Sequence, residues 1–491
     1  MLVGMDHTVN IPSAVPKASS DPLPEIAEFL GPFSPLFRRS QSRRSLERYT
    51  TGLLTDLDRK NCDTIAGALA GTSTERLQHL LTDADWDSLK LDEARVRSLS
   101  AKSPKGGVLV LDDTSFPKQG KASVGVARQY CGALGKRANC QVVVSAEYVA
   151  DEPESSRPLH WPVCARLYLP EGWAEDRERR ERSHVPREVI FGSKPQIALA
   201  LVDLSHEWEV PSEVVVADSG YGKYPSFLGG LEERKLSYVC GVESTFGVRL
   251  PEEVRAAKEA GAPPYQGRGR PPKERPAPLY TAQELIGSLP DEAWRTVSWR
   301  EGTKATLSKR MVALRAHRAT GSARRHSTDH ELVLTAAEGW LIAERPLPGE
   351  PSSTENKEGE EELKYYYSSL GAEVSLERMA SVAKSRWAIE QFYEDAKGEC
   401  GLSDYQGRRW DGLHRHLALS MLAYSFLMLH SSVTTSVGSS SSGEAFFPLG
   451  QAHDASGDPQ AGTSVAAGGP GAMVDRNRSD RDLPSSQKLT K

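Results

Sequence analysis

The sequence predicts an α/β protein whose mixed sheet is flanked by helices, and three observations support this fold class. First, apolar runs of strand length, such as 107–112 and 213–217, recur between residues 106 and 243. Second, three strand-like runs come in succession before helices and strands begin to alternate, which is typical of a mixed sheet. Third, 491 residues exceed what one hydrophobic core usually serves. We therefore expect two or three folded units.

The N-terminal part is predicted to be helical. Residues 1–22 are rich in proline and serine and are expected to be disordered. Residues 23–100 follow with helical periodicity, and a break at Gly71 separates a short helix from a second one. Two helices joined by a tight turn fit a DNA-binding domain, but any small helical bundle gives the same pattern. Both interpretations stay open at this point.

The α/β core is predicted in two parts. Residues 101–244 carry its first strands and helices, and residues 331–436 resume the same pattern after an interruption. The interruption, 245–330, is basic and rich in proline and glycine, and it predicts an inserted domain. Beyond residue 436 the chain is dominated by serine, glycine, alanine and proline, so 437–491 is expected to be a disordered tail.

Composition favours a cytoplasmic protein. Hydrophobic residues make up 38% of the chain, and the longest apolar stretch, 417–429, is shorter than the roughly 17–25 residues that span a bilayer. The N-terminus has no secretory signal pattern, and six scattered cysteines form no CxxC pair. A formal net charge of −5 does not exclude a nucleic-acid partner, because the segments 37–48 and 267–276 are strongly basic.

Acidic residues at three distant positions form the main functional signal. Asp113 and Asp218 lie where strand-like runs end, and Glu390 lies on a predicted helix far downstream. Ligand sites in open α/β sheets gather at the carboxyl ends of strands. Carboxylates that converge there can hold two divalent metal ions about 3.5–4 Å apart for phosphodiester chemistry. Any one of these acids alone could instead be a turn residue or part of a solvated helix face.

The predicted helix around Glu390 adds two cations. At about 100° per residue, Arg386, Glu390 and Lys397 lie on one helix face. A cation on each side of a metal-binding carboxylate would suit the phosphates of a DNA strand.

Three long motifs resemble the transposases of the insertion-sequence 701 family. They are LVLDDTSFPKQGKASVGVARQYCG at 109–132, VVVADSGYG at 214–222, and RWAIEQFYEDAKGECGLSDYQGRRWDGLHRH at 386–416. That family belongs to the insertion-sequence-4-like DDE transposases, which have a ribonuclease-H-like catalytic core. The likeness spans roughly residues 24–430, and the motifs occur in the family's order.

The resemblance implies a fold, a reaction and its partners. It implies a ribonuclease-H-like mixed sheet with an N-terminal helical domain and an inserted β-rich domain. It implies a metal-dependent endonuclease and strand transferase in which Asp113, Asp218 and Glu390 are catalytic and bind Mg²⁺, with Mn²⁺ as a substitute. The implied partners are DNA, as transposon inverted repeats and target DNA, and a second copy of the chain in a homodimeric synaptic complex. Such a protein would be cytoplasmic and associated with the nucleoid when bound to DNA.

Two positions have close rivals, and one departs from the family. Asp112 competes with Asp113, because adjacent strand residues face opposite ways; motif alignment favours Asp113. Glu394 competes with Glu390 but lacks its spacing to Lys397. The family's tyrosine, three residues before the arginine, is Ala383 here, which puts in doubt only the phosphate contact of that tyrosine.

Five residues are candidate DNA ligands. Arg386 and Lys397 would contact phosphate beside Glu390. Lys118 and Lys121 follow the first strand and are either phosphate ligands or solvated surface residues. Trp299, in the predicted insertion, would stack on a displaced base as aromatic residues do in single-strand binding, although a core position is the commoner explanation for a tryptophan.

Two other functions remain compatible with the sequence. One is a ribonuclease-H-like nuclease that does not transfer strands. The other is a catalytically inactive transposase relic that still binds DNA, for which Ala383 and the unusual tail are the motives.

Overall fold

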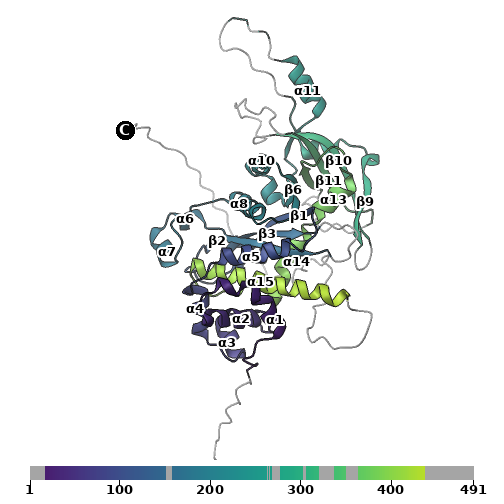
Figure 1. The fold of residues 1–491 in the computed structure, drawn as a ribbon. Coiled ribbons are helices and arrows are strands. Elements are labelled where there is room, and N and C mark those ends of the chain that lie inside the picture. Colours follow the sequence, from purple (N-terminus) through teal and green to yellow (C-terminus); the bar gives the residue numbers. More distant parts are fainter. Residues whose placement is uncertain are drawn as a thin grey trace, which may run out of the picture. The chain divides into compact units, whose positions relative to one another are not determined.

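A mixed sheet of twelve strands runs through the part of the chain that the structure describes (Figure 1). This computed structural model describes residues 17–150, 158–261, 264, 266–267, 277–301, 306–319, 337–349 and 363–436. The strands are β1 (Gly107–Pro117), β2 (Ala127–Cys131), β3 (Lys136–Val149), β4 (His160–Leu167), β5 (Ser212–Ala217), β6 (Ser237–Val242), β7 (Gly247–Arg249), β8 (Tyr280–Thr281), β9 (Arg295–Glu301), β10 (Thr306–Arg318), β11 (Glu338–Arg345) and β12 (Lys364–Ser368).

Helices accompany the sheet along most of the chain. They are α1 (Pro24–Leu30), α2 (Ser40–Leu54), α3 (Cys62–Ala68), α4 (Thr74–Thr82), α5 (Ser88–Ser100), α6 (Glu171–Ala174), α7 (Arg177–Arg182), α8 (Lys194–Glu207), α9 (Ser219–Gly222), α10 (Pro225–Glu233), α11 (Pro251–Ala260), α12 (Ala282–Gly287), α13 (Leu376–Lys384), α14 (Trp387–Glu399) and α15 (Trp410–Ser436). No described helix is long and apolar enough to cross a membrane.

The strand order confirms the predicted ribonuclease-H-like mixed sheet. The order is β2-β3-β1-β5-β6-β12-β11-β10-β7-β8, with β4 also on β3 and β9 also on β10. β1 pairs antiparallel with β3 and parallel with β5, and β5 pairs parallel with β6. The parallel strands β1, β5 and β6 therefore form the centre, and their carboxyl ends lie at one edge.

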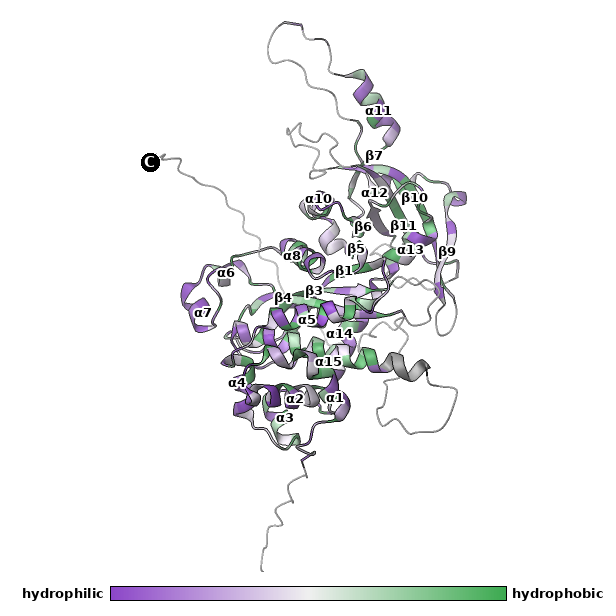
Figure 2. Cartoon of the chain, viewed as in Figure 1, coloured by the Kyte–Doolittle hydropathy of each residue, from purple (hydrophilic) through white to green (hydrophobic). Residues whose placement is uncertain are grey.

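The two faces of the central strands belong to two different cores. Val108 and Val110 of β1 pack in the core that contains α14, α15 and the N-terminal helices. Leu109 and Leu111, which alternate with them, pack in the core that contains α8 and α10. β-branched and aliphatic residues favour this pleated arrangement, and in Figure 2 green marks only parts of the strands and of α15. Each residue of β1 is thus assigned to one face by its parity.

The inserted region extends the core sheet. Its strands β7, β8, β9 and β10 connect to the core through β11 and β12, because β10 pairs with β11 and β12 pairs with β6. The predicted insertion, 245–330, is described only in part, and the sheet is continuous from β6 through β12, β11 and β10.

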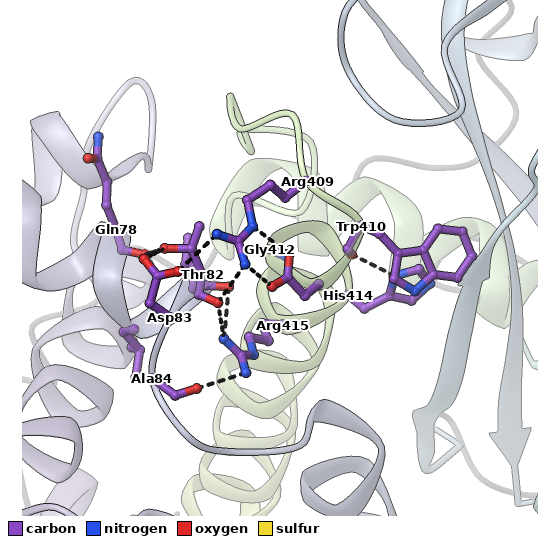
Figure 3. Close-up of polar contacts among 12 residues, drawn as sticks. Gln78, Thr82, Asp83, Ala84, Arg409, Trp410, Gly412, His414 and Arg415 are labelled. Carbon is purple, nitrogen blue, oxygen red and sulfur yellow. Dashed lines mark hydrogen bonds and ion pairs between the residues drawn. The ribbon is translucent and has the colours of Figure 1, made fainter. Parts of the chain in front are cut away.

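The N-terminal helices pack on α15. Helices α1 to α5 lie between residues 24 and 100, and the buried apolar residues of α1 to α4, with Leu91 of α5, share one core with α15. In Figure 3, Arg415 of α15 donates hydrogen bonds to carbonyl oxygens of Thr82 and Ala84 at 2.8 Å each, where α4 ends. Arg409 forms an ion pair with Asp83 at 2.9 Å. The last carbonyls of a helix have no partner within it, so these guanidinium groups join α4 to the core.

The predicted chain ends are largely outside the described residues. The tail 437–491 lies outside them, and so do residues 1–16. Residues 17–22, which the sequence predicts to be disordered, contact the helices instead: Lys17 donates a hydrogen bond to the carbonyl of Ala66 at 2.7 Å, and Ala18 forms a β-bridge with Leu69.

Candidate active site

Two aspartates occupy matching positions on the neighbouring parallel strands β1 and β5. Leu111 of β1 pairs with Ala217 of β5, so the next residues are Asp112 and Asp218. Register partners in a parallel pair point to the same face of the sheet. The backbone of Asp218 is still extended, with φ −79° and ψ −179°, before α9 begins. Asp112 and Asp218 therefore share one face at the carboxyl edge of the sheet.

The shared face is the one that α14 covers. Val110 and Val216, two residues before Asp112 and Asp218, both pack in the core that contains the apolar residues of α14. Side chains two residues apart on a strand point the same way. Glu390, the predicted third acid, belongs to α14, so all three residues approach from this side of the sheet.

Asp113 points to the opposite face, where it has its own partners. The ammonium group of Lys194 on α8 lies 2.9 Å and 3.0 Å from its two carboxylate oxygens. The hydroxyl of Tyr221 on α9 donates a hydrogen bond to it at 3.3 Å. The carboxylate of Asp113 is thus held by a cation and a phenol on the side away from α14.

Arg386 connects the first aspartate to the helix glutamate. Its guanidinium forms an ion pair with Asp112 at 2.7 Å and a second ion pair with Glu390, one helical turn on. Burial alone would lower the pKa of Arg386, but the two carboxylates raise it overall. Arg386 immediately precedes α14, so the start of this helix fixes the guanidinium beside Asp112.

Burial and neighbouring charges act in opposite directions on Asp112. Removal from water raises the pKa of its carboxyl group to about 7. The charge of Arg386 lowers this pKa, and the nearby charge of Asp218 raises it again. This influence agrees with the strand register, which makes the two carboxylates neighbours. A buried acid with a strongly shifted pKa, beside residues that line a cleft, is typical of a functional site.

The donors at this edge fit a divalent cation. The Oδ1 atom of Asp218 is buried and has no hydrogen-bond partner among the described residues. A buried carboxylate oxygen without a partner is costly, and a hard cation with oxygen ligands would satisfy it. Within the described ranges, no three His, Cys, Asp or Glu side chains lie close enough to form a ready-made metal site. In this structure Glu390 instead pairs with Arg386.

Lys397 lies along the same face of β1. Its ammonium group donates a hydrogen bond to the hydroxyl of Thr114 at 2.7 Å, two residues beyond Asp112. Burial lowers the pKa of Lys397. The predicted pair of cations on α14 therefore brackets the strand segment that contains Asp112.

An open cleft of about 990 Å³ borders these residues. It lies between the ends of β5, β6 and β12 and the junction of α13 with α14. The charged residues that line it are Asp218, Glu243, Glu390, Lys364, Lys384 and Arg386. Ala383, which stands where the family has tyrosine, also lines the cleft. Acids at the sheet edge and cations around them make a site suited to a polyanion that binds through metal ions.

The other predicted DNA ligands, Lys118, Lys121 and Trp299, do not line the cleft. Lys118 is half-buried, and its ammonium group donates a hydrogen bond to the carbonyl of Tyr405 at 2.6 Å. Lys121 is exposed and lines a different cavity. Trp299 on β9 is half-buried, with the ammonium group of Lys384 5.2 Å from its ring centroid. Lys384 itself lines the cleft, so Trp299 lies just behind one wall of the site.

Sequence reasoning did not identify Lys194, Tyr221 or Lys384. Lys194 and Tyr221 approach Asp113 from α8 and α9, and nothing in their local sequence indicates that partner. Asp112 shares its parity with Val108 and Val110, which pack on the α14 face, but the sequence does not show which face α14 covers.

Comparison with known proteins assigns the chain to a family. A family model described as DDE superfamily endonuclease matches residues 32–306, which is more than half of the chain. A second model, described as transposase DDE domain, matches residues 192–426. Together they cover the strands and helices that carry Asp112, Asp218 and Glu390.

A curated relative agrees with these models. It is the probable transposase for insertion sequence element IS701 of Microchaete diplosiphon, which is 27% identical over 237 residues. The match covers 48% of this chain and 58% of that protein. The expected likeness to insertion-sequence 701 transposases is therefore confirmed. The chain belongs to the DDE endonuclease superfamily.

Proposed function

We propose that this protein is a DNA transposase that cleaves the ends of its own element and joins the freed 3′ hydroxyl to target DNA. The observation that carries the proposal is the register of β1 with β5, which puts Asp112 and Asp218 on the face that α14 covers with Glu390. Family membership supports the reaction class, since DDE proteins are named for three such acids.

The proposed acidic set is Asp112, Asp218 and Glu390. Asp113 was favoured by motif alignment, but its carboxylate lies on the other face with Lys194. Asp112 meets the geometric requirement that Asp113 does not, because it neighbours Asp218 and is connected through Arg386 to Glu390. We therefore propose Asp112 as the first catalytic acid.

Mg²⁺, or Mn²⁺ in its place, would be held by Asp112, Asp218 and Glu390. When bound, such ions activate a water or 3′ hydroxyl nucleophile and neutralise charge that develops on the phosphate. The orphaned Oδ1 atom of Asp218 is the donor that most needs such a ligand. Glu390 has a side chain that is 54% exposed and pairs with Arg386, so it can turn toward the two aspartates.

The cations of the cleft would position DNA. Arg386 and Lys384 line it directly, and Lys364 does so from β12. A guanidinium binds phosphate through two parallel hydrogen bonds, whereas an ammonium acts as a point charge. Arg386 would then exchange its carboxylate partners for phosphate oxygens when a DNA strand binds.

Cleavage of terminal-repeat DNA tests the proposal. Purified protein with Mg²⁺ should nick a duplex that carries the inverted repeat found at the element's borders. Asp218→Asn and Glu390→Gln should each reduce single-turnover cleavage by roughly 10³-fold or more, because each removes a metal-binding charge. Glu394→Gln is the matched control, since Glu394 is exposed on the same helix one turn on. Equal loss in the control variant would contradict the assignment of Glu390.

A pre-cut end separates transposition from simple cleavage. A duplex that already has a free 3′ hydroxyl should be joined to a plasmid by the wild-type protein, with size change of the labelled strand as the readout. Cleavage without joining would favour the nuclease alternative. Binding of the repeat without metal-dependent cleavage would favour an inactive relic.

Two copies of the chain are expected to act together on two ends. A complex formed with end DNA should therefore have the mass of two protein copies and two duplexes in light scattering. A complex of one copy and one duplex under cleavage conditions would contradict the proposed dimer.

A further inference from the structure

A second cavity, separate from the acidic cleft, has four cations among its seven lining residues. Its volume is about 580 Å³, and its lining residues are Lys121, Ala122, Trp173, Arg179, Arg182, Ser183 and Arg408. We call this set the basic pocket. It combines the loop after β1, the helices α6 and α7, and the loop before α15. Figure 1 shows α6 and α7 near β2, away from β9 and α13, and α7 is strongly hydrophilic in Figure 2.

A buried tryptophan packs against one of the arginines of the basic pocket. Trp173 is 2% exposed, and its indole N–H donates a hydrogen bond to the carbonyl of Val126 at 2.7 Å. The guanidinium carbon of Arg179 lies 3.8 Å from the centroid of its ring. One guanidinium nitrogen of Arg179 donates a hydrogen bond to the carbonyl of Lys121 at 3.3 Å, and the stacking holds the plane so that its other N–H groups can bind a ligand. Arg179 is therefore positioned before any ligand binds.

The loops of the basic pocket are tied to one another by backbone hydrogen bonds. The N–H of Val124 donates to the carbonyl of Arg408 at 3.1 Å, and the N–H of Trp410 donates to the carbonyl of Ser183 at 2.8 Å. Lys118 adds its bond to the carbonyl of Tyr405. Three segments that are distant in sequence thus present their cations to one cavity as a fixed group.

The positive charge of the basic pocket is poorly compensated. Among the described residues, no ion pair involves the Lys121 ammonium or the Arg408 guanidinium. Arg179 is 4.0 Å from Asp176, and Arg182 is 3.7 Å from Glu178 with both side chains more than two-thirds exposed. Exposed pairs at these distances contribute little. No acidic residue lines the cavity.

The position of the basic pocket relative to Asp112 follows from β1. The strand continues from Asp112 to Pro117, which is about 16 Å at the usual rise per residue. Lys121 comes four residues after the end of this strand. Duplex DNA rises about 3.4 Å per base pair, so this run of strand corresponds to about five base pairs. The loop that contains Lys121 therefore begins about five base pairs of duplex length from Asp112.

We propose that the basic pocket binds backbone phosphates of the DNA duplex about five base pairs or more from the reacting bond. This inference rests on the proposed function, which supplies the DNA in the cleft, and it adds a positioning site that performs no chemistry. Because the ligand is phosphate, contact should be independent of base sequence. The cations would set the direction in which the duplex leaves the active site.

Salt dependence of DNA binding tests the proposal. The variant Lys121→Ala/Arg408→Ala should bind a fluorescent end duplex roughly tenfold more weakly, and the slope of log affinity against log salt should fall by about 2, near 0.9 per lost phosphate contact. Arg177→Ala is the control: Arg177 is an exposed arginine of α7, paired with Glu181, that does not line the pocket. The control should keep the wild-type slope.

Duplex length adds a second readout. When the duplex is shortened to fewer than about five base pairs on one side of the cleavage position, the wild type and the double variant should bind equally well. An unchanged slope in the double variant, or an affinity difference that does not depend on duplex length, would overturn the proposal. Pyrophosphate that competes at the basic pocket more strongly than duplex DNA would also overturn it, in favour of a small phosphorylated ligand.

Failure of this inference is distinguishable from failure of the proposed function. Thermal unfolding of the double variant should match the wild type, because both substituted side chains are exposed. If Asp218→Asn cleaves DNA normally, the proposed chemistry is wrong while the binding result stands. If cleavage follows the proposed acids but the slope is unchanged, only the role of the basic pocket is wrong.

Discussion

The acidic cleft and the joint between α4 and α15 both contain arginine and aspartate side chains. The two regions differ in how completely their polar groups are hydrogen-bonded. At the joint, Arg415 alone donates hydrogen bonds to four carbonyls, those of Leu81, Thr82, Ala84 and Trp86. In the cleft, an oxygen of Asp218 has no partner among the described residues, and burial raises the pKa of its neighbour Asp112. Complete satisfaction is what stability requires. Incomplete satisfaction marks a place where a ligand is expected.

The largest expected effect separates the two adjacent aspartates of β1. Asp112→Asn should lower single-turnover cleavage of end DNA by roughly 10³-fold or more, because it removes a charge that neighbours Asp218. Asp113→Asn should lower it less than about tenfold, since its carboxylate pairs with Lys194 on the other face. Thermal unfolding measured alongside would report any cost of losing the Lys194 pair.

The opposite ranking would break the comparison. If Asp113→Asn removed activity while Asp112→Asn preserved it, the cleft on the α14 face would not be the catalytic site. The pair is well matched, because the two residues are neighbours in one strand and receive the same substitution.

The sequence was sufficient for the sheet and for two of the three proposed acids. Apolar runs of strand length predicted β1 and β5, and the position at a strand end predicted Asp218. The choice between Asp112 and Asp113 needs to know which face α14 covers, and that depends on packing between segments almost 280 residues apart. Local sequence contains no such information, although a consistent assignment of valines 108 and 110 to the α14 face would have favoured Asp112.

The basic pocket is even harder to predict from the sequence than the acidic site. Lys121 was visible from the sequence as a cation after the first strand, but its neighbours Arg179 and Arg408 come from segments that meet only in the fold. The sequence run 177–182 reads as a charged surface helix. What makes it a site is the support of Trp173 and the bonds between loops.

Removal of the joint's central arginine should cost stability and not chemistry. Arg415→Ala would remove the guanidinium that binds four carbonyls at and after the end of α4, although Thr82 keeps a bond from Arg409 and Ala84 keeps one from the N–H of Trp86. We therefore expect a loss of about 3 kcal/mol in the free energy of unfolding. Arg38→Ala is the control, because the Arg38 to Asp85 pair is 82% and 76% exposed and should contribute less than about 1 kcal/mol. Denaturant unfolding measures both. Similar small losses in the two variants would show that the joint is not a structural link.

Acid should weaken the packing of α15 on β4 and α2 through two buried histidines of α15. The N–H of Leu167 donates to Nε2 of His414 at 3.3 Å, and His416 binds the hydroxyl of Tyr49 and the carbonyl of Gly401 at 2.8 Å and 2.9 Å. Both rings are neutral here, and burial lowers the pKa of each to about 4.

The sign of this effect follows from the unfolded state. The folded pKa is below the unfolded value of about 6.5, so unfolding takes up protons below that pH. Stability contributed by each histidine is present above pH 6.5 and is lost as the pH falls toward 4. Between pH 7 and pH 5 we expect a loss of about 2 kcal/mol for each ring. His416→Gln should remove its share of this slope in denaturant unfolding, and an unchanged slope would contradict a neutral buried ring.

The smallest expected effect concerns Trp299, which has features of both a structural residue and a residue of the acidic cleft. It is half-buried like a structural residue, but its ring adjoins Lys384, a cation that lines the acidic cleft. If it stacks on a displaced base, Trp299→Ala should weaken binding of an end duplex with an unpaired terminal base by about 1 kcal/mol, or roughly fivefold. Trp299→Phe should restore most of that affinity, because stacking needs an aromatic face and not the indole N–H. Fluorescence anisotropy with blunt and unpaired ends distinguishes the two roles: equal loss on both duplexes, together with a lower unfolding temperature, would assign Trp299 to the core, since a purely structural residue has no preference for an unpaired base.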